Sequence, residues 1–160
     1  GAIGPDREIV ILPEERRVRV RSVQVYGREV SEARAGQRTA LNLAGVETGE
    51  LRRGMVLAAP DTFRPTTQID CRLTLLDSAR TLKSSSRVHL HLGTSEQVAE
   101  IFSLTGKPLE PGRTHFVQLR LKEPTVAALG DRLKALEADW RDSGFSLSKQ
   151  DLLTRAGAAT

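Results

Sequence analysis

The clearest candidate for chemistry is a single arginine, Arg38, in the segment AGQRTALNLAG at residues 35–45. Its neighbours are small, apolar or uncharged, and the alternation that follows predicts a strand that begins here. We expect a guanidinium at the mouth of a strand, among such neighbours, to be screened less than one in open water and to favour an anionic ligand. The alternative is that Arg38 is a solvated strand end, because arginine is usually exposed.

A second set of cations occurs in the segment RRVRVRSVQVYG, where Arg17, Arg19 and Arg21 alternate with valines. Side chains alternate across a strand, so this pattern predicts one apolar face and one basic face, with a bulge where the phase slips after Arg21. The basic face can neutralise nucleic-acid phosphates, or it can be a solvated face without a ligand. Nearby carboxylates are expected to pair with some of these arginines: Glu14, Glu15 and Glu29.

Two histidines, His89 and His91 in VHLHLG, lie two residues apart on a predicted strand and so share a face, as a pair of metal ligands would. A closed zinc site needs four ligands, but Cys71 falls on the opposite phase of its strand and His115 belongs to another strand. We therefore expect no metal, and we interpret the face shared by Arg87, His89 and His91 as solvated or RNA-facing.

The sequence offers no candidate for catalysis or for a cofactor. It lacks a phosphate loop, because the glycines of TGKPLEPG have the wrong spacing and no helix is predicted after them. The net charge of +4 permits a nucleic-acid partner without requiring one. Aromatic residues make up only 4% of the chain, so we expect contacts to the RNA backbone rather than sequence-specific reading of single strands.

The predicted location is the cytoplasm, with no membrane association. No stretch approaches the roughly 18 apolar residues of a membrane span, and GAIGPDREIV does not read as a signal peptide. The lone Cys71 can form no internal disulfide, which agrees with a reducing compartment. We interpret it as a core residue.

The hydrophobic pattern divides the chain into three parts. Up to about residue 130 it consists of short strands separated by turn residues, which predicts a mainly β fold of two tandem small antiparallel β-barrels. The segment APDTFRPTTQ is the predicted linker between them. After Gly130 the helical spacing in DRLKALEADWRDSG predicts a short helical tail. The predicted domains are residues 1–62, 63–132 and 133–160.

Several of these segments follow one another as in a known family. The stretch from EIVILPEERR to RRGMVLA resembles the second domain of the bacterial selenocysteine-specific translation elongation factor, the SelB type. RVHLHLGTSEQVAEIFSL followed by FVQLRLKEPTVAALGDR resembles its third domain, so the resemblance covers roughly residues 8–132. The tail resembles the opening of the winged-helix region of that family.

The resemblance implies delivery of selenocysteyl-tRNA to the ribosome at a recoded UGA codon. In that family the first domain binds GTP and magnesium, the two barrels grip the acceptor arm of the tRNA, and the winged helices hold a hairpin in the message. The resemblance also assigns Arg38 to the aminoacyl pocket, where its charge suits a selenol that is ionised at neutral pH. The alternative is a β-barrel module that docks a protein partner and has lost RNA binding.

The sequence departs from the family pattern at three places. The GTPase domain and the first strand of the second domain are not in the chain, so we expect neither GTP binding nor catalysis. The third domain is expected to lack its closing strands, because GDR runs directly into the predicted helix, and this would leave unpaired strand edges. The helical region stops at Thr160, as in a fragment or an internally deleted relative.

Overall fold

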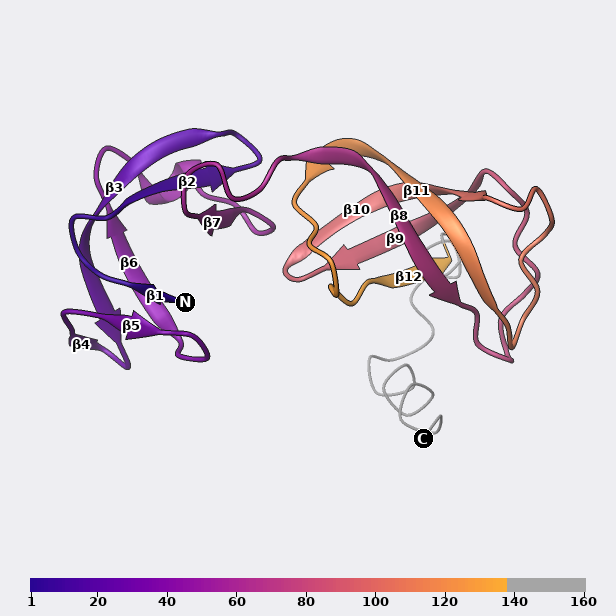
Figure 1. Ribbon diagram of the computed structural model, residues 1–160, viewed down its shortest axis with the longest axis horizontal. Helices are drawn as coiled ribbons and strands as arrows, with labels where there is room; N and C mark the ends of the chain where they lie inside the picture. Colours follow the sequence, from indigo (N-terminus) through magenta and orange to yellow (C-terminus); the bar gives the residue numbers. More distant parts are fainter. Residues whose placement is uncertain (138–160) are drawn as a thin grey trace.

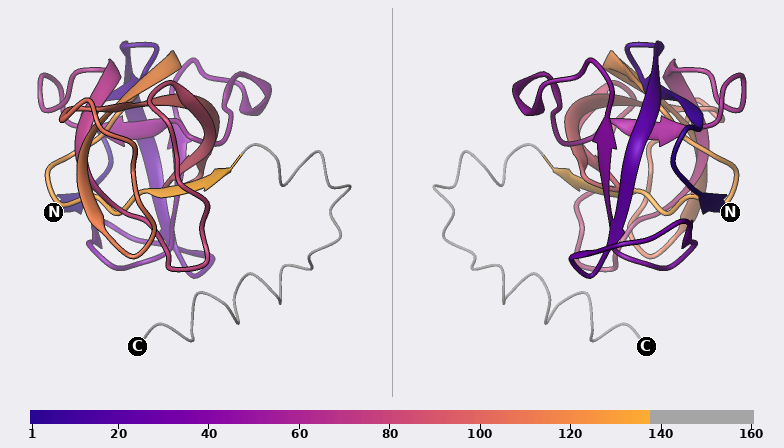
Figure 2. Two further views of the ribbon diagram at one scale, coloured as in Figure 1. Left: turned by 90° about the vertical axis from the view of Figure 1, so that its right-hand side faces the viewer. Right: turned by 90° about the vertical axis from the view of Figure 1, so that its left-hand side faces the viewer.

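A computed structural model describes residues 1–137 of the chain, and these residues form antiparallel β-structure almost throughout. Figure 1 shows two β units side by side, joined by the segment between β7 and β8. In the end-on views of Figure 2, the strands of each unit wrap around the middle of that unit. The prediction of a mainly β chain with two small barrels in tandem is confirmed.

The first barrel is built on the long strand β3, which pairs with β2, β4 and β6. Strand β2 also pairs with β7, and β1 pairs with β5 in a small separate sheet. One 3₁₀ turn, Thr48–Glu50, precedes β7. The strands are β1 (Ala2–Ile3), β2 (Glu8–Leu12), β3 (Arg16–Val25), β4 (Arg28–Glu29), β5 (Ala33–Arg34), β6 (Thr39–Leu43) and β7 (Val56–Ala58).

The alternation predicted for β3 is present. Val18, Val20 and Val23 are buried in the barrel core, while Arg19 and Arg21 between them are exposed. The register between β3 and β6 shifts between the pair Val20–Leu43 and the pair Ser22–Asn42, and this irregularity is the predicted bulge. A bulge of this kind returns the valines after it to the core, since it corrects the slipped phase.

The second barrel is a five-stranded antiparallel sheet in the order β12-β9-β10-β11-β8. Its core contains Leu90, Ile101, Leu109 and Leu119, each with almost no exposed surface, and the half-buried Cys71 packs against it as predicted. Its strands are β8 (Thr66–Thr74), β9 (Ser86–Leu92), β10 (Ser95–Ser103), β11 (Thr114–Thr125) and β12 (Lys134–Glu137).

The prediction of a helix after Asp131 is wrong for its first turn. Lys134–Glu137 is a strand, β12, which pairs with β9 from Val88 to His91. Backbone groups on the open side of β9 need partners, and this demand outweighs the helical spacing of a short segment. β12 therefore supplies the further strand that we expected the third domain to lack. The rest of the predicted tail lies outside the described residues.

The two barrels contact each other directly. The Gly54 N–H of the first barrel donates a hydrogen bond to Thr94 Oγ1 of the second, at 3.0 Å. Gly54 has a φ of +93°, and a Cβ there would lie 2.9 Å from Ser95 Cβ. Val126 packs against an apolar cluster of the first barrel: Val10, Leu12 and Ala58. The junction is therefore a packed contact that requires a glycine.

No helix within residues 1–137 has the length and apolar composition needed to cross a membrane.

Candidate nucleic-acid interface

Arg38 lies between a hydrogen-bonded turn and the first residue of β6. The Gln37 N–H donates to the Arg34 carbonyl oxygen at 3.2 Å, and the Arg34 N–H donates to Gln37 Oε1 at 2.7 Å. Gly36, with a φ of +88°, allows the chain to reverse within this turn. Thr39 then begins β6. The backbone of Arg38 is thus fixed on both sides by structure that the sequence encodes locally.

The side chain of Arg38 is exposed, and it has no hydrogen bond or ion pair to any of residues 1–137. The expectation that its neighbours shield it from water is wrong, since small side chains such as Ala35 and Gly36 leave the guanidinium open to solvent. Its charge and its donor groups are consequently free to meet a ligand that approaches this end of the barrel.

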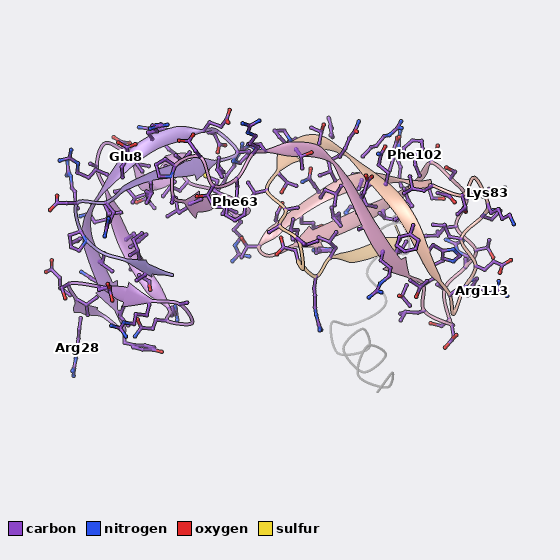
Figure 3. The ribbon with its side chains drawn as sticks, viewed as in Figure 1. Glu8, Arg28, Phe63, Lys83, Phe102 and Arg113 are labelled. Atoms are coloured by element: carbon purple, nitrogen blue, oxygen red, sulfur yellow. The ribbon has the colours of Figure 1, made fainter. Side chains whose placement is uncertain are left out.

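The strand register brings a hairpin turn beside Arg38. Val25 of β3 pairs with Thr39 and with Arg28, so the turn between β3 and β4 lies next to the start of β6. Tyr26 in this turn is 77% exposed, and Figure 3 shows Arg28 extending away from the ribbon at the same end. Sequence analysis did not single out Tyr26 or Arg28; the turn dipeptide YG was the signal that could have located them.

The basic face of β3 is exposed as predicted, but its arginines differ in their partners. Arg17 forms ion pairs with Glu8 at 3.0 Å and with Asp61 at 3.6 Å. Arg19 and Arg21 have no carboxylate partner within residues 1–137. Arg19 and Arg21 therefore carry the uncompensated positive charge of this face.

The expected pairing of these arginines with Glu14, Glu15 and Glu29 is wrong. Glu14 instead accepts a hydrogen bond from Arg52 at 2.7 Å, and no ion pair joins Glu15 or Glu29 to the stripe in the described part of the chain. Proximity in sequence was misleading, because antiparallel pairing with β2 brings Glu8 to the stripe, while Glu14 pairs with Arg52 instead.

Arg21 also lines an open hollow in the first barrel that sequence analysis missed. Arg16 donates from Nη1 to Glu50 Oε1 at 2.7 Å and also contacts the Gly45 carbonyl oxygen. The Glu47 N–H, and after it the Arg16 guanidinium, lower the pKa of Glu50 below its ordinary value. The hollow is lined by Arg16, Arg21, Asn42, Leu43, Gly45, Val46, Glu47 and Glu50. Arg21 is its only uncompensated cation among these lining residues.

The predicted face on β9 is only partly open. Arg87 is exposed but lies 3.4 Å from Glu100, and His89 Nδ1 lies 3.4 Å from Glu96 Oε1. The His89 side chain is only 13% exposed, so its interpretation as a solvated or RNA-facing side chain is wrong. His91 is half-buried. No cluster of three or more His, Cys, Asp or Glu side chains suited to a metal occurs in the described part of the chain.

Two antiparallel barrels in direct contact, with free arginines at the surface of the first, define a barrel pair of the translation elongation factor type. A family model described as the selenocysteine-specific elongation factor, beta-barrel domain, matches residues 69–136. A selenocysteine-specific elongation factor from Desulfomicrobium baculatum is 44% identical over 133 residues, which is 82% of this chain. The chain belongs to the selenocysteine-specific elongation factor family.

Solved structures agree with this assignment. The bacterial selenocysteine-specific elongation factor EF-Sec superimposes with a TM-score of 0.72 and 27% identity over 87% of the chain. The elongation factor SelB from Methanococcus maripaludis, in its apo form, superimposes with a TM-score of 0.73 at 24% identity and shares the fold. The chain spans only 21% of the Desulfomicrobium relative and 22% of EF-Sec.

Proposed function

We propose that this chain is the part of a selenocysteine-specific elongation factor that binds selenocysteyl-tRNA, and that Arg38 faces the aminoacyl group of that tRNA. The observation that carries the proposal is the free guanidinium of Arg38, held by a turn and a strand within the AGQR segment of a family member. A selenol is ionised at neutral pH, so the guanidinium can form a charge-assisted hydrogen bond to it. Serine, the uncharged precursor, gains no comparable contact.

The tRNA backbone is the proposed ligand of the basic face of β3. Arg19 and Arg21 supply positive charge without an internal partner, whereas Arg17 is already paired with Glu8. Each phosphate that such an arginine neutralises releases counterions, which favours binding at low salt. Arg87 and His91 remain weaker candidates, since Glu100 lies beside Arg87 and His91 is half-buried.

The proposed setting is the cytoplasm, where the factor delivers its tRNA to the ribosome at a recoded UGA codon. GTP and magnesium belong to a domain outside this chain, and we propose that the chain itself catalyses no reaction, because TGKPLEPG provides no phosphate loop. The message hairpin that the resemblance implies would be a ligand of the predicted tail, most of which lies outside the described residues.

Salt dependence of tRNA binding tests this proposal. The log of the affinity of the chain for selenocysteyl-tRNA is expected to fall linearly with the log of salt, because phosphate contacts dominate. Arg19→Ala and Arg21→Ala should each reduce the slope by about one unit. Arg17→Ala is the matched control, and its effect should be smaller because Glu8 already neutralises Arg17.

A binding curve that is insensitive to salt and to all three substitutions would reject the tRNA role. It would favour the other class of function, a barrel that docks a protein partner, because an apolar protein interface responds weakly to salt.

A further inference from the structure

The hairpin turn between β3 and β4 contains a residue that its backbone conformation disfavours. The turn consists of Tyr26 and Gly27, with φ values of +50° and +77°. A two-residue turn with a positive φ at both positions matches the type I′ hairpin, in which the preferred first residues are asparagine, aspartate and glycine. A bulky side chain is an outlier in this conformation. The turn would therefore form more readily with asparagine in place of Tyr26.

The side chain of Tyr26 does not stabilise the first barrel in compensation. It is 77% exposed, it belongs to neither apolar cluster of that barrel, and it forms no hydrogen bond or ring contact with any of residues 1–137. Residues with a strained backbone gather at sites that bind ligands, where the strain serves function. A strained, exposed tyrosine whose side chain has no such contact within the barrel therefore indicates a contact with a ligand.

Tyr26 is a neighbour of Arg38 across the end of the sheet. Val25 pairs with Thr39, so the next step of the antiparallel register sets Tyr26 opposite Arg38. Arg38 has no ion pair within residues 1–137. Glu29, the carboxylate of β4, is separated from Arg38 by β3, because β4 and β6 pair with opposite edges of that strand. This end of the barrel thus presents an exposed ring beside a free guanidinium.

A ligand that contacts both side chains must present a flat group to the ring and an anion to the guanidinium. The acceptor end of selenocysteyl-tRNA presents both, because the aminoacyl group and the terminal base are attached to the same ribose. The terminal base is unpaired, and an unpaired base stacks on an aromatic ring whatever its identity. One tyrosine therefore suffices for this contact, in a chain of which only 4% of the residues are aromatic.

We propose that Tyr26 binds the acceptor end of the tRNA by stacking on its terminal base, while Arg38 faces the aminoacyl group. This role rests on the proposed function, because it assigns a second residue to the same ligand. The two residues act differently, since selenocysteyl-tRNA and its seryl precursor share the terminal base and differ in the aminoacyl group. Tyr26 consequently adds affinity for both tRNAs, whereas Arg38 selects between them.

One substitution in the full chain separates binding from stability. Tyr26→Asn should raise the urea midpoint of unfolding, because asparagine suits the type I′ turn. The same variant should bind both tRNAs at least about fivefold more weakly, because the stacking surface is lost, and the ratio of the two affinities should not change. Tyr26→Phe keeps the ring and should bind as the wild type does. Ser85→Asn is the matched control: Ser85 is also exposed, with a φ of +69°, but it precedes β9 of the second barrel, so both affinities should be unchanged.

Chemical modification reports on the contact itself. Tyr26 is the only tyrosine of the chain, so the formation of nitrotyrosine by tetranitromethane measures access to this ring alone. Saturating selenocysteyl-tRNA should slow the nitration of Tyr26, because a stacked base covers the ring. Uncharged tRNA from which the 3′-terminal nucleotide has been removed should protect the ring less than intact uncharged tRNA does.

Three results would overturn the proposal. Two of them leave the tRNA role in place: Tyr26→Asn binds both tRNAs as tightly as the wild type, or bound tRNA does not slow nitration. The third is a lower urea midpoint for Tyr26→Asn, which would show that the ring stabilises the barrel. If the wild-type chain binds neither tRNA, the proposed function itself fails, and the role of Tyr26 fails with it.

Discussion

Replacing Gly54 with alanine should destabilise the junction between the barrels. The residue has a φ of +93°, and a backbone conformation that side chains rarely adopt costs on the order of 1–3 kcal/mol. The added Cβ would also lie 2.9 Å from Ser95 Cβ and 3.1 Å from Ser95 Cα, and such overpacking costs about 1–3 kcal/mol. We therefore expect Gly54→Ala to lower the free energy of unfolding by at least about 2 kcal/mol.

Urea denaturation measures this loss, and a second glycine separates its two causes. Gly36 has a φ of +88° but nothing within 4 Å of its Cβ position, so Gly36→Ala reports the backbone strain without the contact. Adding Ser95→Gly to Gly54→Ala should recover part of the difference, because it removes the nearest clashing atom. Equal losses for Gly54→Ala and Gly36→Ala would refute the packed junction.

Three further expectations concern single groups. The carboxyl of Glu50 should titrate below the ordinary pKa of a glutamate in an NMR pH series, because the Glu47 N–H and then Arg16 lower its pKa; its stabilising effect is present above the ordinary pKa and is lost as the pH falls through the lowered one. Cys71 should react slowly with a thiol reagent at neutral pH, since burial, and after it Asp70, raises its pKa; a rate equal to that of free cysteine would count against this. Amides of β11 should be protected from hydrogen exchange at least as well as those of β6, because β11 is paired on both sides; faster exchange in β11 would contradict the five-stranded order.

Most of the fold could be predicted because apolar and polar residues alternate along each strand, and this pattern is visible within a short stretch of sequence. The valines and arginines of β3 gave its faces and its bulge, since side chains in a strand repeat every two residues. The strand Lys134–Glu137 could not be predicted this way. Its leucine spacing is helical, and only the unpaired edge of β9, formed by residues more than forty positions earlier, makes it a strand.

The candidate site was predictable in position but not in environment. The AGQR segment located Arg38 at the start of a strand, yet its exposure depends on how small its neighbours are and on what lies across the barrel end. Likewise, alternation identified Arg17, but its partners Glu8 and Asp61 arise from pairing and from the linker. The spacing of residues within one strand does not predict which residues of distant segments will lie beside it.

The most direct test of the central claim is the selectivity that Arg38 confers. In the Desulfomicrobium baculatum factor, this chain can replace the segment that it matches, and the affinities for selenocysteyl-tRNA and seryl-tRNA can be measured at one salt concentration. Arg38→Ala should lower the preference for selenocysteyl-tRNA by roughly ten- to a hundredfold, since hydrogen bonds to charged groups contribute about 1.5–3 kcal/mol. Arg38→Lys should restore part of it, because lysine keeps the charge but loses the donor fork.

Arg28→Ala is the matched control, because Arg28 is an exposed arginine at the same end of the barrel. It should leave the ratio of the two affinities unchanged. If Arg38→Ala also leaves that ratio unchanged, with both affinities falling by one factor and the salt slope dropping by about one unit, Arg38 contacts phosphate and the pocket role is contradicted.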